Sequence, residues 1–369
     1  MDYSEVTEGN THFFVPRQDP CHTFPPASTP VFYNPRMELN RDATVLLLTH
    51  LRPSDYLDAM GASGVRGLRV ARECGIPVTI NDREPGAVDL IRQNAAALGD
   101  VVAVTHQDVN VLMSGRSFDA VDLDPFGSPA PFVDAAVRSA RRYLFVTATD
   151  TAPLCGAHLK AGMRRYFARP MNTEYHGEVA LRILLGFVVR EVVKYDRGVE
   201  PVFCFAREHY VRLHLRLLRG AAAADRTLAR IGYIMQCPGC FERTETAGLL
   251  PEPCRCDRCD AAMAPIGPLW LGAINDHATL AALRERAEAM PLGSKVRLTR
   301  LLDVLVQELD TSSHYDYHVI AKAEKVSPTG METVLTRLTA LGYRASRTHY
   351  AGTGIKTDAP LAVLKSVIR

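Results

Sequence analysis

Residues 121–127 (VDLDPFG) hold the side chains whose chemistry is easiest to interpret. An apolar strand is expected to end there and to be followed at once by Asp124, Pro125 and Phe126. The Asp124 carboxylate could hold an amino group and draw off positive charge while its nitrogen attacks an electrophile. Pro125 would keep that oxygen aimed, and an exposed Phe126 ring could stack on a planar base. An ordinary turn at the end of a strand would explain the same residues. The segments that precede the turn are therefore needed to choose between the two interpretations.

Aspartates also stand at the ends of the three strands expected before this turn, at Asp58, Asp82 and Asp108. The carboxyl ends of parallel strands meet at one edge of a sheet, where ligands bind. There Asp82 can reach a ribose diol and Asp108 an adenine amino group. Each aspartate alone is explained as a cap or turn residue. The ordered set, with Asp124 after the next strand, favours a sheet that binds S-adenosylmethionine.

A glycine loop, residues 58–67 (DAMGASGVRG), joins the first of these strands to a helix. Its glycines, Gly61, Gly64 and Gly67, would allow a ligand to approach the backbone closely. Their spacing differs from the G-x-G-x-x-G of dinucleotide-binding folds, which favours a methyltransferase over a nicotinamide enzyme. A tight strand-to-helix turn would explain the glycines without any ligand.

Five of the nine cysteines lie between Cys237 and Cys259. Cys237 with Cys240 and Cys256 with Cys259 form two C-x2-C pairs separated by fifteen residues. This spacing predicts a structural zinc site with four thiolate ligands, and a redox-active pair is the weaker alternative. Cys254 could replace one ligand, so the exact set stays open.

Composition sets the broad class. The chain has 369 residues, 47% hydrophobic and 23% charged, which predicts a packed protein of about two domains. The net charge of +2 means that any surface for nucleic acid must be local. No apolar run reaches the ~18 residues of a membrane span, and the polar start is unlike a secretory peptide. We expect a cytoplasmic protein with no obligate protein partner.

Strands and helices alternate over the first part of the chain. Strands are expected at 55–58, 77–81, 101–105, 118–123 and 142–148, and helices at 41–51, 67–75, 86–98 and 131–141. The alternation predicts an α/β fold with a Rossmann-like, mostly parallel sheet, as in class I S-adenosylmethionine-dependent methyltransferases. The proline-rich residues 1–36 are expected to form an arm without much regular structure.

The later chain is expected to be organised differently. Strands are expected at 200–206 and 210–217, residues 221–225 read as a connection, and the pattern is helical from 276. We predict a catalytic domain over 1–266, with an N-terminal arm (1–40) and a zinc-knuckle segment (233–266). A smaller, mainly helical C-terminal domain is predicted over 267–369. Its helices and basic hairpin follow the order of a winged module.

Several segments together resemble one known family. They are residues 30–42 (PVFYNPRMELNRD), GASGVRGLR, VDLDPFGSP, VTATDTAPLCGAH, KYD and RTHYAGTGIKTDAP. They are similar to the archaeal-type tRNA (guanine-26, N2)-dimethyltransferases, from about Glu8 to Ala359. The resemblance implies an enzyme that transfers two methyl groups in turn from S-adenosyl-L-methionine to N2 of guanine 26 in tRNA. The C-terminal domain would then bind tRNA.

The same resemblance implies roles for individual residues. The cofactor contacts of the family fall on Arg41, Arg66, Asp82 and Asp108 with Val109. Its catalytic carboxylate matches Asp124, its aromatic residue matches Phe126, and Phe32 becomes the second wall of a guanine pocket. The two arginines would bind a cofactor carboxylate as forks, or pair with nearby aspartates instead. The N-terminal arm would close over the cofactor as a lid, and the zinc would be structural.

Two basic clusters are expected to contact RNA phosphates. One comprises Lys160, Arg164, Arg165 and Arg169, and the other Arg138, Arg141 and Arg142. A solvated helix face explains either cluster equally well. In the C-terminal domain, the expected tRNA contacts are Arg344, Arg347, His349 and Lys356.

Two alternatives stay open. A guanine-N2 methyltransferase that acts on another RNA or position, or that stops after one methyl group, would use the same D-P-F-G turn. A zinc-bearing RNA-binding module without activity is the alternative of another class. It predicts that Asp124→Ala leaves function unchanged.

Overall fold

The computed structural model describes residues 2–17 and 31–369. Contacts divide it into two compact units, each made of segments far apart in the chain. Unit 1 comprises residues 1–147, 214–217 and 278–302, and unit 2 comprises 148–213, 218–277 and 303–369. This division follows packing rather than activity, so the functional domains 1–266 and 267–369 stay a prediction.

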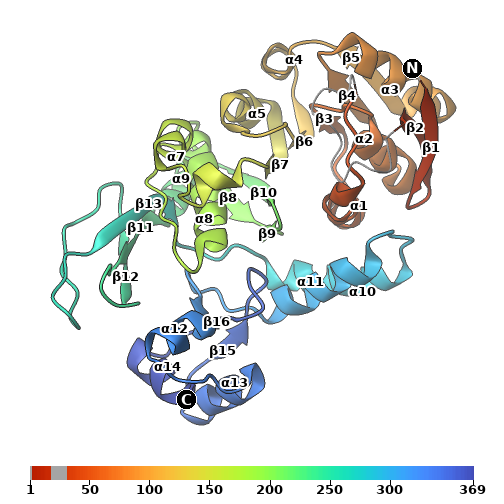
Figure 1. Ribbon diagram of the computed structural model, residues 1–369. Coiled ribbons are helices and arrows are strands. Elements are labelled where there is room, and N and C mark those ends of the chain that lie inside the picture. Colours follow the sequence, from red (N-terminus) through yellow and green to blue (C-terminus); the bar gives the residue numbers. More distant parts are fainter. Residues whose placement is uncertain (1, 18–30) are drawn as a thin grey trace. The chain divides into compact units, whose positions relative to one another are not determined.

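Unit 1 is built on a parallel sheet (Figure 1). Its parallel strands are β3 (Tyr56–Asp58), β4 (Val78–Asp82), β5 (Val102–His106), β6 (Phe118–Leu123) and β7 (Ala140–Ala148). They lie in the order β5-β4-β3-β6-β7. The order reverses between β3 and β6, and sheets of this kind bind ligands at the carboxyl ends of the strands beside the reversal. The predicted sheet is confirmed.

Four helices connect these strands: α2 (Val65–Arg69), α3 (Pro85–Ala95), α4 (Val109–Gly115) and α5 (Val133–Ser139). Helix α1 (Glu38–Leu51) precedes the first of them. Helix α2 packs on β3 and β4, α3 on β4 and β5, and α5 on β6. Strand β6 is buried along its whole length, as is usual for a strand inside a parallel sheet. Its aspartates, Asp119 and Asp122, must therefore find partners inside the protein.

The N-terminal residues form a β-hairpin, so the expectation of an arm without regular structure was wrong for this part. Strands β1 (Tyr3–Glu8) and β2 (Thr11–Pro16) pair in register, and β2 packs on α2 and α3. Asn94 of α3 fixes the hairpin, because its side chain bonds the backbone N–H and C=O of Phe14 at 2.8 and 2.9 Å. The predicted lid falls partly on residues 18–30, which lie outside the described residues.

Unit 2 has helix α8 (His176–Val193) at its centre. This helix is buried around most of its circumference. Around it lie α6 (Thr151–Leu154), α7 (Leu159–Tyr166), β8 (Arg197–Pro201) and β9 (Phe205–Arg207). Strand β10 (Tyr210–Arg219) has residues in both units, and α9 (Ala221–Leu228) packs on α8 and β8. Residues 221–225, expected to be a connection, thus form a helix that leads from β10 to the next strand, β11 (Ile231–Gln236).

A small antiparallel sheet carries the cysteines. It comprises β11 (Ile231–Gln236), β12 (Arg243–Ala247) and β13 (Ala264–Trp270), in the order β12-β11-β13. Helix α8 lies directly on β13, and Gly186 makes this possible, because a Cβ there would come within 2.9 Å of Leu269 Cα.

The C-terminal part begins with α10 (His277–Ala289) and α11 (Lys295–Gln307), and residues 278–302 of these helices belong to unit 1. The remainder has its own hydrophobic core. Its elements are β14 (Tyr315–Asp316), α12 (Tyr317–Ala323), α13 (Met331–Ala340), β15 (Ala345–Arg347), β16 (Gly354–Thr357) and α14 (Leu361–Val367). The strands form an antiparallel sheet in the order β14-β16-β15.

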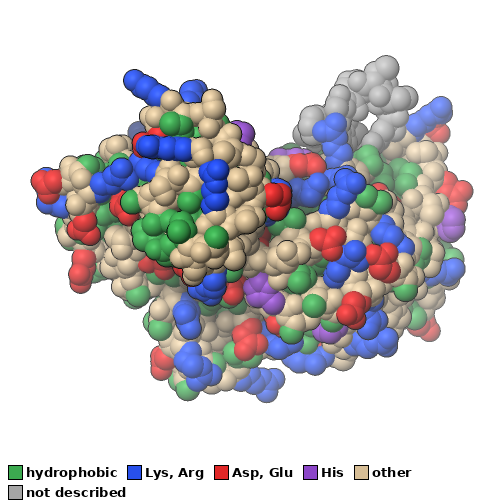
Figure 2. Space-filling model, turned by 90° about the horizontal axis from the view of Figure 1, so that it is seen from below, with side chains coloured by type: hydrophobic (Ala, Val, Ile, Leu, Met, Phe, Trp, Pro, Cys, Tyr) green, Lys and Arg blue, Asp and Glu red, His purple; other side chains and the backbone are tan. Residues whose placement is uncertain are grey.

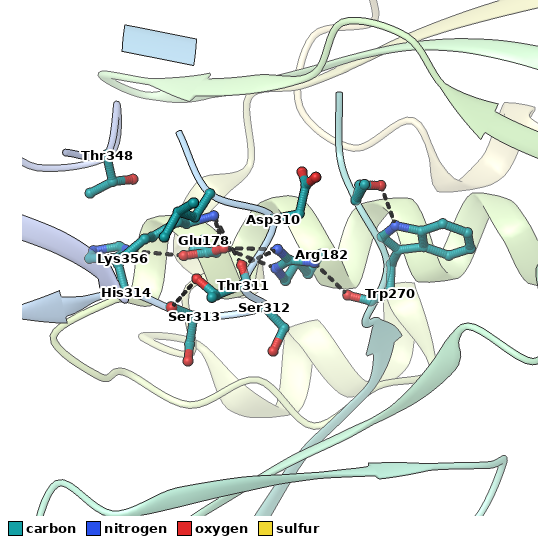
Figure 3. Close-up of polar contacts among 12 residues, drawn as sticks. Glu178, Arg182, Trp270, Asp310, Thr311, Ser312, Ser313, His314, Thr348 and Lys356 are labelled. Carbon is teal, nitrogen blue, oxygen red and sulfur yellow. Dashed lines mark hydrogen bonds and ion pairs between the residues drawn. The ribbon is translucent and has the colours of Figure 1, made fainter. Parts of the chain in front are cut away.

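A buried charged network joins α8 to this C-terminal part (Figure 3). The Glu178 carboxylate lies 2.9 Å from Lys356 Nζ, 2.8 Å from His314 Nδ1 and 3.0 Å from Arg182. The Lys356 side chain is only 1% exposed and also pairs with Glu308 at 3.2 Å. Two carboxylates thus balance the two permanent cations Arg182 and Lys356, which is what burial of charge requires.

Candidate active site

The D-P-F-G turn, residues 124–127, follows β6 at the reversal of the sheet. Pro125 is buried, whereas Phe126 is 80% exposed and is the most exposed phenylalanine of the described chain. Phe32 lies edge-on to it, with ring centroids 6.0 Å apart and an angle of 77° between the rings. Residues 94 positions apart in the sequence thus provide two aromatic surfaces beside Asp124.

Arg66 holds the Asp124 carboxylate. Its Nη2 donates to Asp124 Oδ2, and its Nη1 donates to Asn40 Oδ1 and Thr44 Oγ1, both at 3.0 Å. Because Arg66 is buried and braced by α1, it fixes the direction of Asp124 before any substrate arrives. This pairing is the alternative that the sequence left open for Arg66.

A buried aspartate also lies close to Arg66. Asp122 on β6 is 3.7 Å from Arg66 and accepts a hydrogen bond from Tyr56 Oη at 2.6 Å. Asn40, Thr44, Tyr56 and Asp122 were all missed in the sequence. The available signal was Asp122 itself, since a carboxylate inside an apolar strand needs a buried partner.

Asp58 and the glycine loop are bound to each other. Asp58 is 2% exposed and its Oδ2 accepts the Gly67 N–H at 2.9 Å. Burial is the main reason that the pKa of Asp58 is raised to about 7, and the positive charge of Arg66 acts in the opposite direction. Gly64 has φ of +80°, and a Cβ on Gly61 or Gly67 would come within 2.4 or 2.5 Å of Ile80. The burial favours a positioning role for Asp58, and its predicted cofactor contact stays a prediction.

The other two strand-end aspartates are more accessible. Asp82 accepts backbone N–H groups from Ala62 at 2.8 Å and Glu84 at 2.9 Å. Asp108 caps α4, where its Oδ1 accepts from Asn110 and Val111. A carboxylate has about four acceptor sites, so both side chains keep room for a ligand. Val109, the first residue of α4, is buried beside Asp108.

Arg41 does not reach the D-P-F-G turn by any contact in the described part of the chain. Its Nε lies 2.8 Å from Glu8 Oε2, its Nη2 pairs with Glu8 Oε1, and the whole group is buried. Tyr33 Oη donates to the same carboxylate at 2.8 Å. Although burial opposes ionisation, Arg41 lowers the pKa of Glu8. The ion pair ties α1 to the N-terminal hairpin, and a cofactor contact by Arg41 stays a prediction.

The four paired cysteines form one group. Cys237 follows β11, Cys240 precedes β12, and Cys256 and Cys259 lie in the segment between β12 and β13. Their Sγ atoms all lie within 4.8 Å of one another, with individual separations of 3.4 to 3.8 Å. Four sulfurs around a tetrahedral zinc at ~2.3 Å would be about 3.8 Å apart, so the group fits the ion. Cys254 lies outside the group.

The C-terminal residues expected to bind tRNA have other partners. Lys356 and His349 are buried side chains held by Glu308, so their assignment to an RNA surface was wrong. Arg344 pairs with Asp358 and Arg347 with Glu332 at the surface. On the face seen in Figure 2, basic and acidic side chains are interspersed over the described residues. None of the helices in the described ranges is long and apolar enough to cross a membrane.

Comparison with known proteins places these residues in a family context. A family model described as N2,N2-dimethylguanosine tRNA methyltransferase matches residues 9–369. A protein of Methanoculleus marisnigri named tRNA (guanine(26)-N(2))-dimethyltransferase is 71% identical over 100% of this chain and 99% of its own length. One of the same name from Methanosphaerula palustris is 62% identical over the same shares.

A solved structure is also similar. It is described as Trm1 from Pyrococcus horikoshii in complex with S-adenosyl-L-methionine. Its TM-score is 0.89 at 38% sequence identity, covering 99% of this chain and 100% of that one.

Proposed function

Since the chain belongs to the N2,N2-dimethylguanosine tRNA methyltransferase family, we propose that it methylates N2 of guanine 26 in tRNA, twice in turn, with S-adenosyl-L-methionine as methyl donor. The observation that carries the proposal is the Asp124 carboxylate, which Arg66 holds two residues before the exposed ring of Phe126, itself in edge contact with Phe32.

The rings of Phe126 and Phe32 would bind the guanine after it has left the stacked bases of the tRNA. A base inside folded RNA must leave its neighbours before an enzyme can reach it. Stacking on Phe126 offsets part of that cost, at about 1–3 kcal/mol per base. Phe32 then limits how the guanine can turn, because its ring stands nearly perpendicular to that of Phe126.

Asp124 acts on the amino group. Guanine N2 is a weak nucleophile because its lone pair is delocalised into the ring. Asp124 accepts an N2–H hydrogen bond, localises the lone pair toward the methyl donor and receives the proton that must leave. Arg66 keeps the carboxylate in one orientation before substrate binds. Less conformational entropy then has to be lost when the carboxylate and the amino group are aligned for reaction.

The donor supplies an electrophilic methyl group on a sulfonium, which needs no further activation. Asp82 and Asp108 suit the ribose diol and the adenine amino group, with Val109 beside the ring. Arg66 and Arg41 are the candidates for the carboxylate of the donor. Each arginine is already paired with a carboxylate of the protein, Arg66 with Asp124 and Arg41 with Glu8. A cofactor carboxylate would have to displace these partners or share the arginines with them.

The zinc group has a structural role in this proposal. The ion would be held by Cys237, Cys240, Cys256 and Cys259. It would cross-link the turn between β11 and β12 to the long segment between β12 and β13. The methyltransferase domain 1–266 would carry the chemistry, and the domain 267–369 would bind tRNA. The proposed location is the cytoplasm.

Substitution of Asp124 tests the proposal. Asp124→Asn keeps the size of the side chain but removes the carboxylate that accepts the proton. Methyl transfer to tRNA should therefore fall about 100- to 10,000-fold. Binding of tRNA, measured by fluorescence anisotropy, should stay within about twofold. Asp89→Asn on α3, an exposed aspartate, is the matched control and should methylate normally. Equal methylation by Asp124→Asn and the control would contradict the proposed role.

A further inference from the structure

Helix α7 and the residues after it present an exposed surface that the catalytic chemistry leaves unused. Leu159, Met163 and Phe167 recur every four residues and are all exposed, so they form one apolar stripe. Lys160 and Arg164 alternate with them, and Arg169 follows. We call these six residues the α7 surface.

The cations of the α7 surface differ from the other basic cluster. Lys160, Arg164 and Arg169 are exposed, and no ion pair with an acid is found for them within residues 2–17 and 31–369. Arg165 is the exception in this segment, because it pairs with Asp150 at 3.0 Å. No acidic residue occurs between residues 151 and 173. The field of the three cations is therefore not neutralised locally.

The second cluster is already neutralised by the protein. Arg138 pairs with Asp134 at 3.1 Å, and Arg141 pairs with Asp55 at 2.8 Å. Arg142 is held by Asp119 through two guanidinium nitrogens. A phosphate would have to displace these acids or share their partners, which weakens the case for an RNA contact there. The structure thus separates two clusters that the sequence could not.

Phe167 is held in an unusual conformation. Its φ is +47°, a left-handed backbone that bulky residues rarely adopt. Arg190 of α8 fixes this turn by donating to the Tyr166 and Phe167 carbonyl oxygens at 2.7 and 3.1 Å. The result is a ring that is 70% exposed on a rigid backbone. Such a ring loses little entropy when a flat partner stacks on it.

We infer that the α7 surface is an RNA-binding surface of this enzyme, with phosphates on Lys160, Arg164 and Arg169 and an unpaired base stacked on Phe167. The inference rests on the proposed function for the identity of the RNA as tRNA. Charge complementarity favours a polyanion, and the exposed aromatic ring among the cations favours nucleic acid over other polyanions, because bases offer flat faces.

The test is tRNA affinity as a function of KCl concentration, measured by fluorescence anisotropy with unmodified transcript. Each phosphate contact contributes roughly 0.7–0.9 to the slope of log affinity against log salt. The triple variant K160Q/R164Q/R169Q should lower this slope by about two to three. Phe167→Leu keeps an apolar side chain but loses the aromatic face, so it should weaken binding about 5- to 150-fold, with the slope unchanged.

The matched control removes the same number of cations from the neutralised cluster. R138Q/R141Q/R142Q should leave the slope within about one of wild type, and thermal unfolding checks that each variant is folded. Wild-type affinity and slope in K160Q/R164Q/R169Q would overturn the inference and assign the surface to another partner. Because binding is measured without methyl transfer, this result is separate from failure of the proposed reaction.

Discussion

Phe126→Ala removes the most exposed phenylalanine of the described chain and tests whether it stacks on the target base. The ring is 80% exposed and touches Phe32 only edge-on, so its loss should change the free energy of unfolding by no more than about 0.5 kcal/mol. Stacking of a base on an aromatic ring contributes about 1–3 kcal/mol. At about 1.4 kcal/mol for each factor of ten, kcat/KM for tRNA should fall roughly 5- to 150-fold.

The assay is initial-rate methyl transfer from labelled S-adenosylmethionine to tRNA, with thermal unfolding in parallel. Phe126→Tyr keeps the aromatic face and should stay within about threefold of wild type, whereas Phe126→Leu should resemble alanine. If both rings hold one base, the double variant with Phe32→Ala should lose less than the sum of the single losses. A folded Phe126→Ala protein with kcat/KM within twofold of wild type would refute the stacking role.

Further predictions concern stability and metal. Lys356→Met should lower the free energy of unfolding by about 3–5 kcal/mol, because it leaves buried carboxylates unbalanced, whereas Arg344→Met should cost at most about 1 kcal/mol; chemical denaturation compares them. Burial opposes ionisation, but His349 and Lys356 lower the pKa of Glu308 from 4.5 to about 2. A depressed pKa stabilises the fold above pH 4.5, so this contribution should decline between pH 4.5 and 2 in thermal unfolding, and a flat profile there would argue against it. Metal analysis should find one zinc per chain, which is lost in Cys256→Ser but kept in Cys254→Ser. The opposite pattern would show that Cys254, and not Cys256, is a zinc ligand.

The parts of the fold that sequence predicts well are those with a local pattern. Strand β6 covers the predicted residues 118–123, and α1 contains the predicted helix 41–51. Both segments differ sharply from their surroundings in apolar content. The turn after β6 follows from its proline, which fixes the backbone whatever lies around it.

Elements without such a pattern were missed or misread. Helix α8 is apolar around nearly its whole circumference, so it lacks the 3.6-residue period by which a surface helix is recognised. Helix α9 begins with four alanines, which show no hydrophobic period at all. In the hairpin, the packing of β2 on α2 and α3 and the bonds from Asn94 come from distant parts of the chain.

Side-chain pairing was the least predictable feature. Lys356 and Arg344 are equally basic in sequence, yet one is buried against Glu178, 178 positions away, and the other is at the surface. Likewise, nothing local to Arg66 indicates that it holds Asp124. The types and positions of candidate residues could be proposed from sequence, while their partners depend on which distant segments of the chain pack together within each unit.

The most direct test of the proposed function is nucleoside analysis of tRNA after reaction with the purified protein and labelled S-adenosylmethionine. One transcript carries guanine at position 26 and a second carries adenine there. We expect N2,N2-dimethylguanosine in the first and no labelled nucleoside in the second. Equal labelling of both transcripts would contradict guanine 26 as the target, and no labelling of either would contradict the proposed reaction itself.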